Sequence, residues 1–137
     1  MSTKMFVNLP VSDLDKSMAF YKALGFTFNS QFTDATAACM VVSEHNYAML
    51  LTHDKFKSFA TKPVADAHKT TGVLVAISLD SKKAVDEMIG KAVKAGGKEP
   101  RAKQDHGFMF QRTFEDLDGH TWEPFWMDPA FVQQSAA

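Results

Sequence analysis

The fold is decided by the stretch Phe114-Glu115-Asp116-Leu117-Asp118-Gly119-His120-Thr121-Trp122-Glu123-Pro124-Phe125-Trp126. Asp118 and Gly119 favour a tight turn, because glycine adopts positive φ at little cost and aspartate tolerates it better than most residues. The aromatic-rich runs on both sides predict two extended strands joined by that turn. Alternate side chains of a strand share a face, so Glu123 is expected on one face of its strand and Trp122 on the opposite face.

Glu123 is a carboxylate in the middle of this apolar strand. Burying a carboxylate is costly unless it is paired, protonated or bound to a cation. One interpretation puts Glu123 at a sheet edge, or pairs it with a lysine or arginine. The other places it in the wall of a functional pocket, where it would pair with a cationic group or with Arg112 from the neighbouring strand. The residues alone leave both interpretations open.

The same order of elements occurs twice along the chain. Ser12 to Asp15 has the pattern of a helix start in which Ser12 caps the free amides, and Gly25 ends that helix. A second helix is expected after Asp80 and Ser81, and it stops at residues 95–97. Extended segments are predicted at residues 5–9, 26–32, 36–43 and 47–52, and again at 73–79, 98–103, 107–114 and 121–127.

This repetition predicts two half-size modules within one compact domain. The first module spans residues 1–54 and the second spans residues 73–128. Residues 55–72 form a polar connector that is also a candidate lid, and residues 129–137 form a tail. Each module has an apolar sheet face, and we expect the two modules to cover these faces against each other.

Composition excludes several classes of function. The 137 residues are 45% hydrophobic and carry a formal net charge of −1. Nucleic-acid binding needs clustered Lys and Arg, which are missing here, so no nucleic-acid partner is expected. No apolar run is long enough to predict a membrane span, and the N-terminus lacks a signal-peptide pattern. The single cysteine, Cys39, predicts a buried thiol, and together these features favour a cytoplasmic protein.

Two segments carry a family resemblance. They are Val11-Ser12-Asp13-Leu14-Asp15-Lys16-Ser17-Met18-Ala19-Phe20-Tyr21-Lys22-Ala23-Leu24-Gly25-Phe26 and the stretch from Phe114 to Glu123. Together they resemble the vicinal oxygen chelate superfamily, which includes glyoxalase I, bleomycin-resistance proteins, fosfomycin-resistance proteins and extradiol dioxygenases. The resemblance implies an α+β glyoxalase-like fold, in which two βαβββ modules form a curled mixed sheet around a cleft. It also implies a homodimer.

The family's metal enzymes take their ligands from four strands, the first, fourth, fifth and eighth. By resemblance, these positions fall here at Phe6, at Leu50 or one residue on either side of it, at Leu74 and at Glu123. Phenylalanine and leucine cannot bind a metal, so no cofactor is predicted. A divalent metal would need Glu123 together with His53 or His106.

The predicted function is therefore the binding of a small aromatic molecule in a largely apolar cleft, without the family's full metal site. The alternative is a metal-dependent lyase of the lactoylglutathione lyase type, or an extradiol dioxygenase, that uses Glu123 and displaced ligands. A third version makes Glu123 a general base without metal. Glu123 is the candidate catalytic residue, and the candidate ligand-binding residues are Phe6, Asn8, Leu50, Leu74, Phe108, Phe110, Arg112, Trp122 and Phe125.

Overall fold

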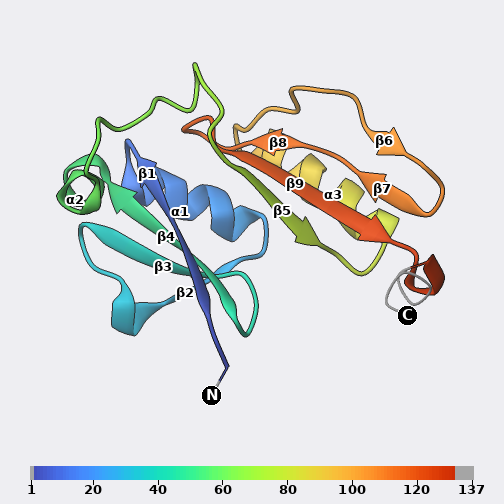
Figure 1. Ribbon diagram of the computed structural model, residues 1–137, viewed down its shortest axis with the longest axis horizontal. Coiled ribbons are helices and arrows are strands. Elements are labelled where there is room, and N and C mark those ends of the chain that lie inside the picture. Colours follow the sequence, from blue (N-terminus) through green and yellow to red (C-terminus); the bar gives the residue numbers. More distant parts are fainter. Residues whose placement is uncertain (1, 132–137) are drawn as a thin grey trace. The chain divides into compact units, whose positions relative to one another are not determined.

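The computed structural model describes residues 2–131, and the chain divides into two compact units, Met1–Thr70 and Thr71–Ala137. We call them unit 1 and unit 2. Each is a mixed α+β unit with one open sheet, as the sequence predicted (Figure 1). Of the predicted tail, residues 132–137 lie outside the described part of the chain. Within residues 2–131 no helix is both long and apolar enough to cross a membrane.

Unit 1 contains a four-stranded sheet in the order β1-β4-β3-β2. The outer strand β1 runs parallel to β4, and the remaining pairs are antiparallel. A short 3-10 helix follows β2 because the Asn29 side chain accepts a hydrogen bond from the Gln31 amide, so the extended segment expected at 26–32 ends early. The strands are β1 (Met5–Val11), β2 (Thr27–Asn29), β3 (Ala37–Val41) and β4 (Asn46–Thr52).

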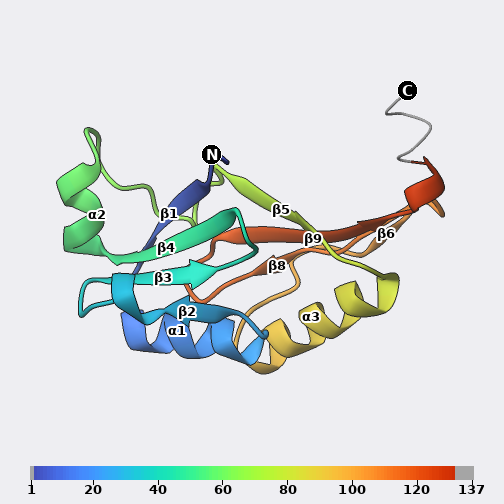
Figure 2. The same ribbon diagram turned by 90° about the horizontal axis from the view of Figure 1, so that it is seen from below.

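Helix α1 (Leu14–Ala23) covers one face of this sheet (Figure 2). Its N-cap is Asp13, whose carboxylate accepts a hydrogen bond from the Lys16 amide at 3.0 Å. The prediction of Ser12 as the cap was wrong by one residue. The apolar stripe of α1 packs on the sheet face formed by Leu9, Val11 and Leu50, which are all buried.

The opposite face of unit 1's sheet carries Phe6 and Asn8 on β1, because side chains alternate along a strand. Helix α2 (His53–Phe59) follows β4 directly, overlaps the start of the segment predicted as a connector, and contacts both β1 and β4. The side-chain oxygen of Thr52 caps α2 by accepting a hydrogen bond from the Lys55 amide.

Unit 2 repeats this topology. Its sheet has the order β5-β9-β7-β6, with β5 parallel to β9, β9 antiparallel to β7, and β7 antiparallel to β6. Helix α3 (Lys82–Lys94) starts after its N-cap Ser81, as predicted, and covers one sheet face (Figure 2). The strands are β5 (Leu74–Ser78), β6 (Gln104–Asp105), β7 (Met109–Gln111), β8 (Phe114–Glu115), which pairs with β9, and β9 (Thr121–Met127).

The turn before β9 forms where the sequence placed it, with Gly119 at a φ of +84°. Its organiser is Asp116, a buried residue whose carboxylate Oδ1 accepts hydrogen bonds from the amides of Asp118 and His120, each at 2.9 Å. The Asp116 amide in turn donates to the His120 carbonyl. This local network fixes the point from which β9 departs, and with it the face on which each β9 side chain lies.

Side chains alternate along β9 as predicted. Trp122 is 1% exposed and stacks on Phe114 with 6.1 Å between ring centroids. Pro124 is also buried, and α3 contributes Val85 and Ile89 to the same core. Glu123 lies on the opposite, half-buried face. The core of unit 2 therefore lies between α3 and one face of the sheet, and the other face is left open within this unit.

Candidate functional site

The open face of unit 2's sheet holds the candidate carboxylate. Oε2 of Glu123 accepts a hydrogen bond from Nε2 of Gln111 at 3.0 Å. Gln111 is paired in register with Phe125, so this contact runs diagonally between β7 and β9. Ala76 of β5 lies beside Glu123 in the register. The carboxylate of Glu123 and the amide of Gln111 therefore stand together on the open face of this sheet.

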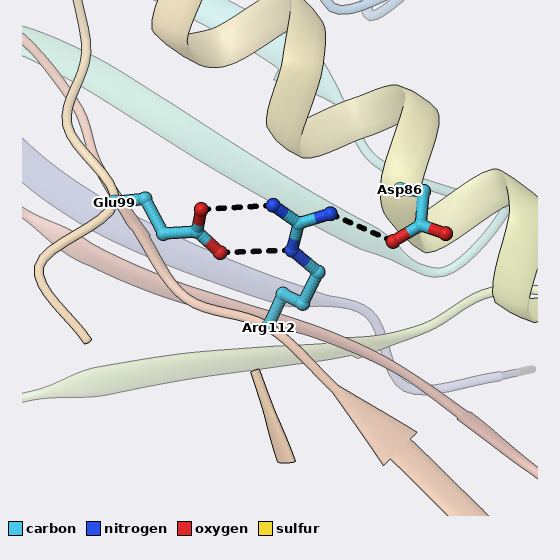
Figure 3. Close-up of polar contacts among 3 residues, drawn as sticks. All are labelled: Asp86, Glu99 and Arg112. Carbon is cyan, nitrogen blue, oxygen red and sulfur yellow. Dashed lines mark hydrogen bonds and ion pairs between the residues drawn. The ribbon is translucent and has the colours of Figure 1, made fainter. Parts of the chain in front are cut away.

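Arg112 is held elsewhere (Figure 3). Its Nε and Nη2 donate to the two carboxylate oxygens of Glu99, each at 2.8 Å, and its Nη1 donates to Oδ1 of Asp86 on α3 at 2.7 Å. The hydrogen bonds from Arg112 lower the pKa of Glu99, and the same bonds raise the pKa of Arg112 above its ordinary value. We call Asp86, Glu99 and Arg112 the arginine clamp.

The suggested pairing of Glu123 with Arg112 is therefore wrong. The Arg112 amide donates to the Pro124 carbonyl, which places Arg112 opposite Pro124 on the neighbouring strand. Residues opposite each other across paired strands share a face, and Pro124 lies on the α3 side. Arg112 thus projects toward α3 while Glu123 projects from the other face. Arg112 lies opposite Pro124 and not opposite Glu123, and this difference of one residue puts the side chains of Arg112 and Glu123 on opposite faces of the sheet.

Three of the predicted ligand-binding residues belong to the core. Trp122 and Phe110 lie on the α3 face of unit 2's sheet and are buried there. Leu50 is fully buried on the α1 face of unit 1's sheet. Their side chains point away from the open faces of the two sheets. Met49 and Leu51, one residue on either side of Leu50, lie on the face that carries Asn8.

The remaining predicted residues reach the surface. Leu74 is 55% exposed on β5, and Phe125 is half-buried on the face of Glu123. Phe6 is 49% exposed, and its ring stacks on Tyr47 with 4.8 Å between centroids. Phe108 lies before β7, away from Glu123 in the register, and stacks on Phe131.

The family's metal does not fit the residues present. Three of the four expected ligand positions hold the hydrocarbon side chains of Phe6, Leu50 and Leu74, and Met49 and Leu51 offer at best a thioether beside Leu50. His53 begins α2, and His106 precedes β7 with its ring 6.2 Å from that of Phe108. Across residues 2–131, no group of three or more His, Cys, Asp or Glu side chains is arranged to hold a metal ion.

Sequence reasoning missed two features. Gln111 was not predicted as the partner of Glu123, although a strand pairing centred on the Asp118-Gly119 turn brings the two residues within diagonal reach. The second feature is a hollow of about 510 Å³ in unit 1, between α2 and the first and fourth strands. Phe56 and Phe59 contribute to it, and both come from the segment that the sequence marked as a connector and candidate lid.

Comparison with known proteins supports the resemblance. Residues 3–43 match the family model described as bleomycin resistance protein-like N-terminal. None of the curated proteins matches the chain. A hypothetical protein from S. aureus superposes with a TM-score of 0.77 at 25% identity, covering 92% of this chain and 94% of that one.

Two further solved structures have the same fold. A glyoxalase/bleomycin resistance protein/dioxygenase family enzyme from Burkholderia phytofirmans PsJN gives a TM-score of 0.72 at 16% identity, with 92% of this chain and 99% of that chain covered. TioX from Micromonospora sp. ML1 gives 0.69 at 20% identity, with the same coverage. The glyoxalase-like fold and the resemblance to the vicinal oxygen chelate superfamily are confirmed.

Proposed function

We propose that this protein binds a small aromatic molecule that carries a cationic or hydrogen-bond-donating group, and that it does so without a metal. The observation that carries the proposal is the Glu123–Gln111 pair on the open face of unit 2's sheet. A neutral amide orients a carboxylate without cancelling its charge. The carboxylate therefore keeps its capacity to pair with a donor on a ligand.

The surroundings of the pair favour an aromatic ligand. Phe125 lies on the same face as Glu123, and apolar neighbours strengthen a charge-assisted hydrogen bond by excluding water. Aromatic rings that pack together gain about 0.5–1.5 kcal/mol beyond the burial of their area. A ligand that combines a flat ring with an ammonium or N–H group would use both parts of this surface.

The residues at the family's metal positions support binding without a metal. Phe6 and Leu74 cannot act as ligands, and Glu123 alone is a poor site for a transition metal. The alternative, a lyase or dioxygenase that recruits Glu123 and a histidine, rests on the retained glutamate. We further propose a homodimer in the cytoplasm. The exposed side chains of Met5 and Val73, each 61% exposed, supply apolar surface for an association between chains.

The test compares tryptamine, an aromatic ammonium, with indole-3-acetate, its anionic counterpart, by calorimetric titration of the purified protein. We expect tryptamine to bind and indole-3-acetate to bind more weakly. Glu123→Gln should weaken tryptamine binding about tenfold, because it removes a charged hydrogen-bond acceptor. Glu87→Gln on the exposed side of α3 is the matched control and should leave binding unchanged.

Two results would contradict the proposal. If Glu123→Gln leaves binding unchanged and raises the melting temperature, Glu123 is a strained structural residue. If the protein purifies without chelator with about one zinc, nickel or iron per chain, and that metal raises the melting temperature, the lyase or dioxygenase alternative replaces the metal-free reading. Elemental analysis and thermal melts of the same preparation decide between these outcomes.

A further inference from the structure

Another pocket of unit 1 lies on the α1 side of its sheet and takes no part in the proposed function. Its volume of about 390 Å³ falls within the range of about 300–1,000 Å³ that is typical of small-molecule sites. We call it the α1 pocket. It lies between α1 and the outer strand β2, and its lining includes Met18, Lys22, Phe26, Phe28, Ser30 and Thr33.

The α1 pocket is on the opposite side of the sheet from the hollow beside α2. Phe28 pairs with Met40, and Met40 pairs with Ala48, which lies two residues from Leu50 on β4. Side chains that are directly opposite across paired strands, or two residues apart along one strand, share a face. Phe28 therefore lies on the face that α1 covers, and Figure 2 shows α1 along this face. Helix α1 contacts mainly β4 and β3, which leaves space beside the outer strand β2.

The end of α1 shapes the pocket. Gly25 has a φ of +102°, and its amide donates to the Lys22 carbonyl at 3.0 Å. The Phe26 amide donates to the Tyr21 carbonyl at 3.1 Å, and the Phe26 ring packs edge-on against the Tyr21 ring with 6.1 Å between centroids. The chain therefore turns back along the helix, and Phe26 becomes a fixed apolar wall. The same bonds occupy the carbonyls of Tyr21 and Lys22, so these carbonyls are not left to repel an anion.

The rest of the lining is mostly apolar. One methionine and two phenylalanines line the pocket, and all three are half-buried. The hydroxyl of Thr33 is already used within the chain, because it donates to the Asn29 carbonyl at 2.8 Å and accepts from the Cys39 amide at 3.0 Å. No acidic side chain is part of the lining. The apolar space therefore has a single charged group beside it, the ammonium of Lys22.

Lys22 carries that charge without a partner of opposite sign. Its side chain is exposed, and its Nζ lies 5.8 Å from the centroid of the Phe28 ring. A cation over the face of a ring is attracted to it, which keeps the ammonium close to the pocket. Lys22 forms no ion pair with any carboxylate of residues 2–131. The pocket thus combines an apolar interior with one positive charge that is not neutralised.

We propose that the α1 pocket binds the anion of a medium-chain aliphatic carboxylic acid. The alkyl chain packs against Met18, Phe26 and Phe28, and the carboxylate pairs with the ammonium of Lys22. Methionine adapts its shape to a flexible chain. The ammonium of Lys22 covers one face of the Phe28 ring, so that face is not available for stacking a flat aromatic ligand. This inference goes beyond the proposal for Glu123 and does not depend on it.

The test titrates hexanoate, octanoate and octylammonium into the isotope-labelled full chain, below their micelle concentrations, while NMR follows the backbone amide resonances. We expect octanoate to shift the amides of residues 18–33. Octanoate should bind about tenfold more tightly than hexanoate, because each buried methylene contributes a factor of about four. Octylammonium has the same alkyl chain and the opposite charge. It should bind about fivefold more weakly than octanoate, because its ammonium is repelled by Lys22.

The ion pair is tested by Lys22→Met, which keeps an unbranched side chain and removes its charge. This variant should bind octanoate about two- to fivefold more weakly, as expected for the loss of an exposed ion pair, and should lose the preference over octylammonium. Lys16→Met makes the same change at an exposed position of α1 that does not line the pocket, so it is the matched control and should leave both affinities unchanged. Because both lysines are exposed, the variants should keep the wild-type melting temperature, which is measured first.

The proposal is overturned if octanoate and octylammonium bind the wild type equally, or if Lys22→Met and Lys16→Met bind octanoate alike. It is also overturned if octanoate causes no shifts, or if its shifts map to β1, β4 and α2 instead of residues 18–33. Glu123→Gln is titrated in parallel and should leave octanoate binding unchanged. Failure of the tryptamine test alone then refutes the function proposed for Glu123, whereas failure of the Lys22 effects alone refutes the site in the α1 pocket.

Discussion

Units 1 and 2 share one topology but use their sheets differently. In both, the first strand pairs in parallel with the last, and one helix covers one face. In unit 1, four of the five residues of β3 are buried, so both faces of that strand are covered. In unit 2, no residue of β5 is fully buried. The repeated topology therefore fixes the order of the elements, whereas the burial of individual strands differs between the two units.

The two units also differ in what supports them outside the shared elements. Unit 1 has α2, which follows its last strand and contacts β1 and β4. Unit 2 has the arginine clamp, in which Arg112, between β7 and β8, binds Asp86 on α3 and Glu99 in the segment that follows α3. The clamp lies on the α3 side of the sheet, so it holds the scaffold and leaves the face of Glu123 free.

The largest expected effect compares the two cores. Trp122→Ala should lower the free energy of unfolding by about 3–5 kcal/mol, and Leu50→Ala by about 2–5 kcal/mol, because each deletes a fully buried side chain and leaves a cavity. Chemical denaturation measures both. Phe6→Ala, at an exposed position, is the control and should cost far less. Equal stability of Trp122→Ala and the wild type would contradict the assignment of Trp122 to the core.

A smaller effect compares the glycines that end the two main helices. Gly25 and Gly96 have φ values of +102° and +107°, so a side chain at either position is strained by about 1–3 kcal/mol. A Cβ at position 96 would also approach Cδ2 of Leu117 to 3.2 Å, whereas a Cβ at position 25 would meet no atom within 4 Å. Gly96→Ala should therefore destabilise the protein more than Gly25→Ala in thermal melts. The reverse order would show that the Leu117 contact does not matter.

The smallest effect concerns the arginine clamp and pH. Arg112→Met should cost about 1–2 kcal/mol at neutral pH, because it removes charged hydrogen bonds that are partly exposed. The folded-state pKa of Glu99 lies below the ordinary value of 4.5. The stabilisation is therefore complete above about pH 4.5 and is lost as the pH falls through the lowered folded-state pKa.

Denaturation curves of Arg112→Met and wild type across this acidic range test the clamp. The difference in stability between them should shrink as the pH falls, because protonated Glu99 no longer attracts Arg112. Glu87→Gln, which alters only an exposed pair with Lys83 on α3, is the control and should follow the wild type. A difference that stays constant with pH would assign the cost to lost packing of the arginine stem.

The sequence predicted the fold well because the signals for it are local. Helix periodicity, the Ser81 cap and the Asp118-Gly119 turn each depend on residues close together in the chain, and each was confirmed. The site was harder to predict. Trp122 and Phe125 were both assigned to the pocket lining, although residues three apart on a regular strand cannot share a face.

The partners of Arg112 and Glu123 show the same limit more sharply. Pairing Arg112 with Asp86 or Glu99 requires the register of β9 and the position of α3, which only the folded chain supplies. The Glu123–Gln111 contact needed the same register. The assignment of the hydrocarbon residues Phe6, Leu50 and Leu74 to the family's ligand positions depended only on the resemblance, and it argued against a metal from the sequence alone.

The distribution of two rare residue types gives each unit its own reporter. The chain's single cysteine, Cys39, is buried in unit 1, where burial raises the pKa of its thiol. Both tryptophans, Trp122 and Trp126, lie in unit 2. The rate of thiol alkylation therefore follows the opening of unit 1, and indole fluorescence follows unit 2. Without any engineered label, one sample under increasing denaturant therefore reveals whether unit 1 and unit 2 unfold together or one after the other.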